Sequence, residues 1–259
     1  MILKRRGLPL VLLAGLAVAG CGGSDGGGPD GGGDAPAAAA AGTGACPDRL
    51  EPLLTADEAA KGEITVAIDQ SGSYWNSTSA EARIKPQIEA VVANAVEQSR
   101  ALRVITFTGT ASGAQTVFAC SNLLPAHNNE AALAQKQRYV AQQAAAELWT
   151  QLTAARAQPA PSAPGTSIVG GWLAVAQSTP LAPDGSPRDA VMLTDGAGLP
   201  EQAVKVDLSA FSGVQMHGIG AVDGAPWTTE RTAKTIDEWA EWLRGSGVPS
   251  PEVSSQSYV

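Results

Sequence analysis

The chain has 259 residues, enough for one large domain or two small ones. Aromatic residues make up only 5% of it, so a core must rely on small and aliphatic side chains, which suits helices packed closely on a sheet. The formal net charge of -8 argues against nucleic acid as a partner, because phosphate binding needs clustered Lys and Arg, and the sequence has no such cluster outside its first six residues. The acidity is consistent with simple solubility.

The opening residues predict a secretion signal. A basic stretch at 4–6 precedes an apolar stretch at 8–18 that is too short to span a bilayer. The sequence then reads Val-Ala-Gly-Cys at 18–21, which resembles a bacterial lipobox. The resemblance implies a signal peptide over 1–20 and a lipidated Cys21, with palmitate in a diacyl anchor that holds the protein on the extracytoplasmic face of the cell membrane. The alternative is an ordinary signal peptide that ends near a Cys.

The composition then divides the chain into a tether and a folded part. Residues 21–45 are nearly all Gly, Ala, Asp, Ser and Pro, which cannot bury enough apolar surface to offset the ordering entropy, so we expect a flexible tether. We expect one folded domain over 46–248 and a C-terminal tail over 249–259.

Two cysteines, Cys46 and Cys120, remain in a compartment that permits disulfides. They allow one intramolecular pairing, so we predict a Cys46–Cys120 bridge. Two buried free thiols are the alternative.

Strand and helix patterns alternate along the folded part. Continuous apolar runs predict strands at 63–69, 102–108, 189–194 and 214–219, and a shorter one at 115–119. Helical spacing and capping signals predict helices at 48–60, from Thr78 through Val96, and at 129–157, 168–177 and 229–244. Thr78 and Glu81 form a capping box at the start of the second helix. This alternation indicates an α/β fold, with a doubly wound, mostly parallel sheet flanked by helices on both faces.

Oxygen-bearing side chains follow two of the predicted strands. Asp69, Ser71 and Ser73 form an Asp-x-Ser-x-Ser sequence after the first strand, and Asp195 follows the strand at 189–194. Thr166 stands in a loop just before the helix at 168–177. Ligands of doubly wound sheets bind at the carboxyl ends of strands, where we expect these residues. Hard oxygens suit Mg²⁺, Mn²⁺ or Ca²⁺ rather than zinc.

In combination, these residues resemble the von Willebrand factor A (vWA) domain and its metal-ion-dependent adhesion site. The resemblance implies that Ser71, Ser73 and Thr166 bind the metal directly, while Asp69 and Asp195 act mainly through bound waters. Mg²⁺ or Mn²⁺ is the expected ion, and Ca²⁺ is possible. Because neutral hydroxyls leave the ion's charge under-neutralised, the expected partner is a protein that offers a carboxylate, as in adhesion or complex assembly.

Other functions remain open on the same residues. Ser, Thr and Asp at these positions are also ordinary cap and turn residues, so the chain is alternatively a metal-independent structural or assembly lipoprotein. Tyr74 and Trp75 are either exposed contacts for a partner or buried packing. A serine hydrolase with His127 as the base is a remote alternative, because nothing around His127 holds it between an acid and a nucleophile. We therefore do not expect an enzyme.

Overall fold

A computed structural model of the protein describes residues 45–55, 58–75, 79–108, 113–127, 129–157, 167–198, 204–221 and 227–259. All of them belong to one compact unit, Ala38–Val259. The predicted signal peptide, Cys21 and all of the tether except Ala45 lie outside the described residues. Within the described part of the chain, no helix combines the length and the apolar character needed to cross a membrane.

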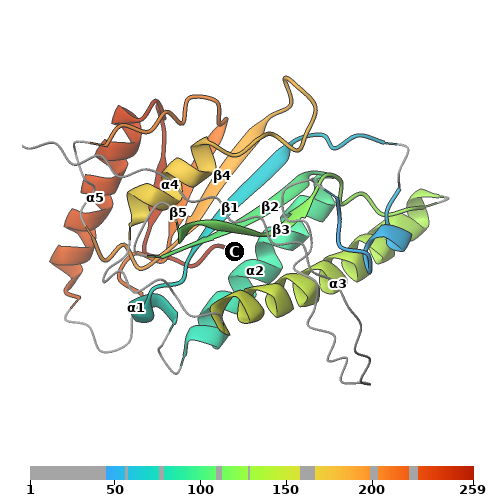
Figure 1. The fold of residues 1–259 in the computed structure, drawn as a ribbon, viewed down its shortest axis with the longest axis horizontal. Coiled ribbons are helices and arrows are strands. Elements are labelled where there is room, and N and C mark those ends of the chain that lie inside the picture. Colours follow the sequence, from blue (N-terminus) through green and yellow to red (C-terminus); the bar gives the residue numbers. More distant parts are fainter. Residues whose placement is uncertain are drawn as a thin grey trace, which may run out of the picture. The chain divides into compact units, whose positions relative to one another are not determined.

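Six strands of the described residues form one mixed sheet (Figure 1). They are β1 (Glu63–Asp69), β2 (Ala101–Phe107), β3 (Gln115–Cys120), β4 (Arg188–Leu193), β5 (Gly213–His217) and β6 (Glu252–Ser254). Their order is β3-β2-β1-β4-β5-β6, and β3 alone is antiparallel to its neighbour. This is the strand order of doubly wound α/β domains, so the predicted fold class is confirmed.

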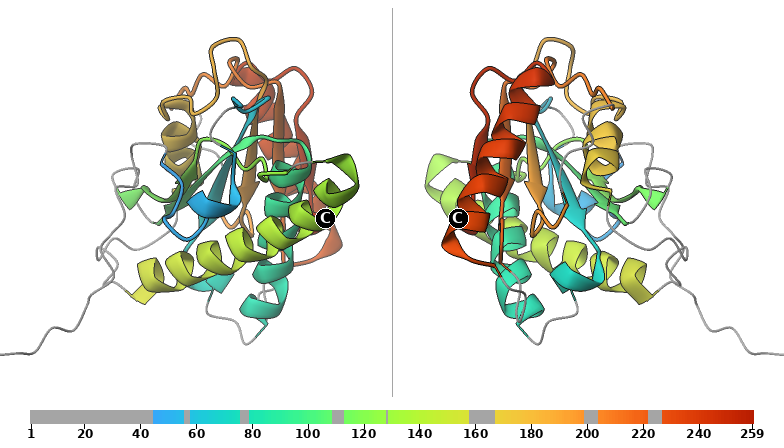
Figure 2. Two further views of the ribbon diagram at one scale, coloured as in Figure 1. Left: turned by 90° about the vertical axis from the view of Figure 1, so that its right-hand side faces the viewer. Right: turned by 90° about the vertical axis from the view of Figure 1, so that its left-hand side faces the viewer.

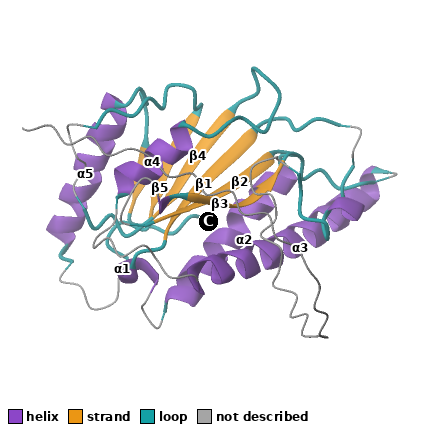
Figure 3. Cartoon of the chain, in the orientation of Figure 1, coloured by secondary structure: helices purple, strands orange, loops and turns teal. Residues whose placement is uncertain are grey.

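In the described part of the chain four longer helices accompany the sheet, and the sequence pattern predicted each of them (Figure 3). They are α2 (Ala80–Glu97), α3 (Glu130–Ala157), α4 (Ile168–Ala176) and α5 (Thr229–Gly245). A single turn, α1 (Gly72–Trp75), follows β1. The predicted capping box is wrong, because Ser79 is the residue before α2 and Glu81 therefore occupies the second helical position.

The predicted helix at 48–60 is wrong. Among the described residues of this range the only helical element is a 3₁₀ turn, η1 (Glu51–Leu53), and Leu54 is already extended. Leu54 instead pairs with Pro125, and the Thr55 amide donates to the carbonyl of Leu124 at 3.0 Å. Pairing with this neighbouring segment satisfies backbone groups that a longer helix would otherwise satisfy.

Buried side chains form one cluster on each face of the sheet. The cluster on one face packs under α2 and α3, and the cluster on the other packs under α4 and α5; Figure 2 shows these helices around the sheet. Ile64, Val66 and Ile68 of β1 belong to the first cluster, and Ala67 belongs to the second. Trp172 and Trp239 are fully buried in the second cluster. Because β1 is covered on both faces, its whole length is buried and only its ends reach polar loops.

The expected C-terminal tail at 249–259 needs correction. It contains β6, which pairs in parallel with β5, and the Gly218 amide donates to the carbonyl of Gln256 at 3.1 Å. The Tyr258 amide donates to Gln87 Oε1 of α2 at 3.0 Å. Backbone pairing with the sheet and the hydrogen bond to the Gln87 side chain of α2 thus hold this segment, and the domain includes it.

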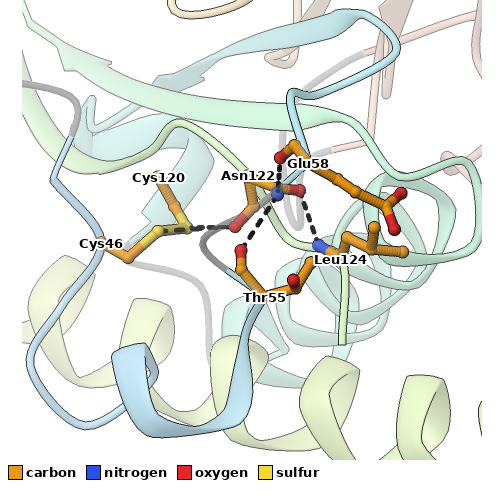
Figure 4. Close-up of a disulfide and its surroundings, with 6 residues drawn as sticks. All are labelled: Cys46, Thr55, Glu58, Cys120, Asn122 and Leu124. Atoms are coloured by element: carbon orange, nitrogen blue, oxygen red, sulfur yellow. Dashed lines mark hydrogen bonds between the residues drawn. A yellow bond between two sulfur atoms is a disulfide. The ribbon is translucent and has the colours of Figure 1, made fainter. Parts of the chain in front are cut away.

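The predicted bridge between Cys46 and Cys120 is confirmed, with Cα atoms 4.1 Å apart (Figure 4). Beside it, the Asn122 amide donates to the carbonyls of Thr55 at 3.3 Å and Glu58 at 2.6 Å. Asn122 also accepts from the Leu124 amide at 2.8 Å. The bridge and these bonds fasten the start of the domain to the end of β3.

Candidate metal centre

Asp69 is the last residue of β1 and is fully buried. One carboxylate oxygen, Oδ1, accepts from the Ser71 amide at 2.7 Å. The other, Oδ2, accepts from the Thr194 hydroxyl at 2.7 Å. Both oxygens therefore hold protein groups in place, one on the loop after β1 and the other just after the neighbouring strand β4.

Ser71 and Ser73 bring their hydroxyls together on this loop. Their Oγ atoms lie 3.1 Å apart, and both side chains are at the protein surface. The turn that holds them is closed by the Trp75 amide, which donates to the carbonyl of Ser71 at 3.0 Å. The sequence prediction that these two hydroxyls share one tight loop agrees with this geometry.

Tyr74 and Trp75 are buried, so of the two alternatives for them the packing one is correct. The Gln87 amide lies 3.5 Å from the Tyr74 hydroxyl, and the Arg83 guanidinium donates to the carbonyl of Tyr74 and lies over its ring. Trp75 stacks on Trp149 of α3, with ring centroids 5.8 Å apart. These contacts anchor α1 in the core, so Ser73 faces outward from a fixed base.

Asp195 follows β4 and is 1% exposed. Its Oδ1 accepts from the Ala197 amide at 2.7 Å. Its Oδ2 is buried and finds no hydrogen-bond partner among the described residues. Because a buried carboxylate oxygen without a partner is costly, this atom is the clearest place in the site for a water or a cation to bind.

The two carboxylates influence each other. Burial, with a smaller contribution from the negative charge of Asp195, raises the pKa of Asp69 to about 6, against the opposing effect of the hydrogen bonds from Ser71 and Thr194. Two buried carboxylates that form no ion pair among the described residues favour a cation beside them.

Thr166 lies outside the described residues, so its place in the site remains a prediction. The next residue, Ser167, caps α4 by accepting from the Gly170 amide at 3.0 Å. The Ser167 amide donates to the carbonyl of Thr108, which directly follows β2, at 3.2 Å. The entry to α4 therefore reaches the same carboxyl edge of the sheet as Asp69, and the capping role is filled by Ser167.

The donors brought together here are hydroxyls and two carboxylates. No group of three or more His, Cys, Asp or Glu side chains suited to a metal occurs in the described part of the chain. His127 is the candidate base of the serine-hydrolase alternative, and its Nδ1 atom lies 3.0 Å from the carbonyl oxygen of Pro125. Thr194 also belongs to this cluster, although it was not predicted as a site residue, because its partner Asp69 lies 125 positions away in the sequence.

The fold and these residues define a doubly wound α/β domain with a polar, hydroxyl-bearing loop cluster at the carboxyl edge of its sheet.

No family model matches the chain, and no curated protein matches it either. Solved structures that resemble it include an aerotolerance-related membrane protein from Bacteroides fragilis, at 16% identity and a TM-score of 0.43, covering 75% of this chain and 90% of that one. BatB from Bacteroides thetaiotaomicron has 15% identity, a TM-score of 0.43 and the same coverage. A von Willebrand factor type A protein from Catenulispora acidiphila has 18% identity and a TM-score of 0.36, covering 70% of this chain and 37% of that one.

Proposed function

We propose that this protein is a vWA-like domain that binds a partner protein through a divalent metal ion, for adhesion or for the assembly of a complex. We further propose that lipid on Cys21 holds it at the extracytoplasmic face of the membrane. The observation that carries the metal proposal is the pair of Ser71 and Ser73 hydroxyls, 3.1 Å apart on the loop fixed by Asp69. The buried, unpartnered Oδ2 of Asp195 supports it.

The residues fit a small, hard cation. Ser71, Ser73 and Thr166 would supply hydroxyl oxygens, and Asp69 and Asp195 would act mainly through bound waters. Mg²⁺ or Mn²⁺ suits this set best, because Mg²⁺ keeps several of its waters in proteins, and Ca²⁺ is the third candidate. Both oxygens of Asp69 already accept hydrogen bonds, so a water-mediated role suits that residue in particular.

When bound, the ion would supply an electrophilic centre for an oxygen ligand from outside. Neutral hydroxyls contribute no charge, and Asp69 and Asp195 lie inside the protein. A carboxylate on a partner protein would complete the neutralisation of the ion's charge. Ser73 faces outward, so the loop is open to such a carboxylate. Binding then depends on the ion.

Calorimetric titration of the full chain with MgCl₂ and MnCl₂ tests the proposal. We expect saturable binding in the wild type and at least a tenfold loss of affinity in Ser71→Ala and in Asp195→Asn. Ser212→Ala, on an exposed serine beside β5, is the matched control and keeps wild-type affinity. Wild-type affinity in both site variants, with their far-UV spectra unchanged, contradicts the proposal.

A second candidate function is metal-independent assembly, in which the helical faces bind the partner. The Ala-lined groove between α2 and α3, of about 660 Å³, is the surface that favours it. Partner binding that survives EDTA and Ser71→Ala supports this alternative. We propose no catalytic activity; a serine hydrolase based on His127 would be revealed by labelling with a serine-directed inhibitor.

A further inference from the structure

A partly open cavity lies away from the candidate metal centre, between α4 and the first residues of β3. Its volume is about 270 Å³. Arg103 of β2 lines it, at a position paired with Thr65, well before the carboxyl ends of the strands where Asp69 pairs with Phe107. The residues that line this cavity are therefore different from those of the candidate metal centre, and ligand binding in the cavity does not depend on the metal.

Arg103 belongs to a buried group of charges that is not balanced. The group contains two guanidinium ions, those of Arg103 and Arg188, and one carboxylate, that of Glu63, which is fully buried. Glu63 Oε1 lies 3.8 Å from Arg103 Nε, and Glu63 Oε2 lies 3.4 Å from Arg188 Nε. The three residues together carry one excess positive charge in a region shielded from water.

The single carboxylate is also shared with other donors. Glu63 Oε1 accepts from the Thr65 hydroxyl at 3.1 Å, and Glu63 Oε2 accepts from the Leu181 amide at 2.9 Å. Its lone pairs are therefore divided among four groups, and neither arginine receives the paired hydrogen bonds that a guanidinium forms with a dedicated carboxylate.

Arg103 retains unused donors at the cavity wall. Its residue is 5% exposed, and its guanidinium forms one hydrogen bond within the described residues, from Nη2 to the carbonyl of Thr179 at 2.7 Å. Nε is buried there without an acceptor. A guanidinium has five N–H donors in a planar fork, so this one can still receive an anion.

The other residues that line the cavity indicate which class of anion it can bind. Thr116 and Gln177 add a hydroxyl and an amide, while Ile105, Leu173 and Ala174 provide an apolar wall. The described lining contains no Asp or Glu. We propose that this cavity binds a small organic carboxylate with a short aliphatic chain, its carboxylate on Arg103 and its chain against Ile105 and Leu173. One excess positive charge matches a monoanion better than a phosphate dianion.

The test uses the full chain in EDTA, with sodium butyrate as the probe and sodium chloride at equal ionic strength as the reference. We expect butyrate to raise the midpoint of thermal unfolding in a concentration-dependent way and to shift one arginine Nε–H signal in ¹H–¹⁵N spectra. Acetate, which lacks most of the chain, should bind more weakly. Equal effects of butyrate and chloride overturn the proposal.

Two variants locate the site. Arg103→Gln removes the charge, and Ala174→Leu fills the cavity while keeping Arg103 and its bond to Thr179. We expect butyrate affinity to fall at least tenfold in each, with Arg138→Gln on the exposed face of α3 as the unaffected control. If Arg103→Gln does not fold, Ala174→Leu decides the question, and wild-type butyrate affinity in that variant overturns the proposal.

Discussion

The Thr194 hydroxyl donates to Asp69 Oδ2 at 2.7 Å and accepts from the Gly196 amide at 3.2 Å. It thereby links the ends of the two central strands, β1 and β4, at the edge where the candidate metal ligands gather. Asp69 and Asp195 keep their relative positions because this buried residue holds the first and directly precedes the second.

Replacing Thr194 by Val should remove both hydrogen bonds while keeping the shape of the side chain. We expect the free energy of unfolding to fall by about 1–3 kcal/mol, because Asp69 and the Gly196 amide lose a buried partner. If the proposed site is correct, Mg²⁺ affinity should also fall by roughly tenfold or more, as for other residues that orient metal ligands. Urea unfolding and calorimetry measure the two effects. Thr194→Ser keeps the hydroxyl and should therefore retain most of the wild-type free energy of unfolding and most of the Mg²⁺ affinity. A loss in Thr194→Ser as large as that in the Val variant would contradict this role.

His217 should make the domain sensitive to mild acid. Burial lowers the pKa of His217 below its ordinary value, outweighing the opposite effects of Glu252 and the Gln256 backbone, and Nδ1 is buried without a partner among the described residues. The unfolded chain therefore binds the proton more readily, so this contribution to stability is complete above about pH 6.5 and is lost as the pH falls towards the folded-state pKa. His217→Phe, which keeps the ring against Tyr258, should remove this contribution, so that on going from pH 7 to 5 the stability of the variant falls less, or rises more, than that of the wild type. Urea unfolding at several pH values checks this, and an unchanged slope would show that another group is responsible.

Loss of the Cys46–Cys120 bond should destabilise the domain strongly, because the bond joins residues 74 positions apart. Chain-entropy reasoning gives about 4 kcal/mol for a loop of this length. We expect the double variant Cys46→Ser with Cys120→Ser to unfold at correspondingly lower urea, and reductant to lower the wild-type midpoint without affecting the variant. Equal midpoints for oxidised and reduced wild type would refute this.

Gly171 lets α4 lie close against β2. A Cβ atom at this position would come within 2.8 Å of the Phe107 ring, so Gly171→Ala should overpack the core and destabilise the domain by about 1–3 kcal/mol. Gly245→Ala is the matched control, because a Cβ there meets nothing within 4 Å and the residue is also helical. Thermal unfolding of the two variants gives the comparison; equal melting points would mean that Phe107 moves aside without cost.

The sequence predicted the central elements because their apolar patterns are long and regular. β1 and β4 are continuous apolar runs, and α5 places Trp239 and Leu243 on one face. β6 was missed because a strand of three residues with one apolar side chain, Val253, has no periodicity to detect, and backbone pairing with β5 alone defines it.

Among the site residues, local sequence was informative for Asp69, Ser71 and Ser73, which share one loop. The role of Thr194 could not be read locally, because its partner Asp69 is 125 positions away and the bond exists only once β1 and β4 are neighbours. The prediction of a helix at 48–60 was wrong for a similar reason. The Thr55 amide donates to the carbonyl of Leu124, which is distant in the sequence, and this pairing cannot be read from the local pattern.

The position of the disulfide also determines how the domain responds to tension on its N-terminal side. A pull applied through Ala45 reaches Cys46 and passes across the sulfur bridge to Cys120, at the end of β3. The intervening residues, β1 and the loop with Ser71 and Ser73 among them, lie inside a covalent ring that a force between Ala45 and any point after Cys120 cannot lengthen while the bridge is intact. The load enters the sheet at its edge strand, away from the central strand that carries Asp69.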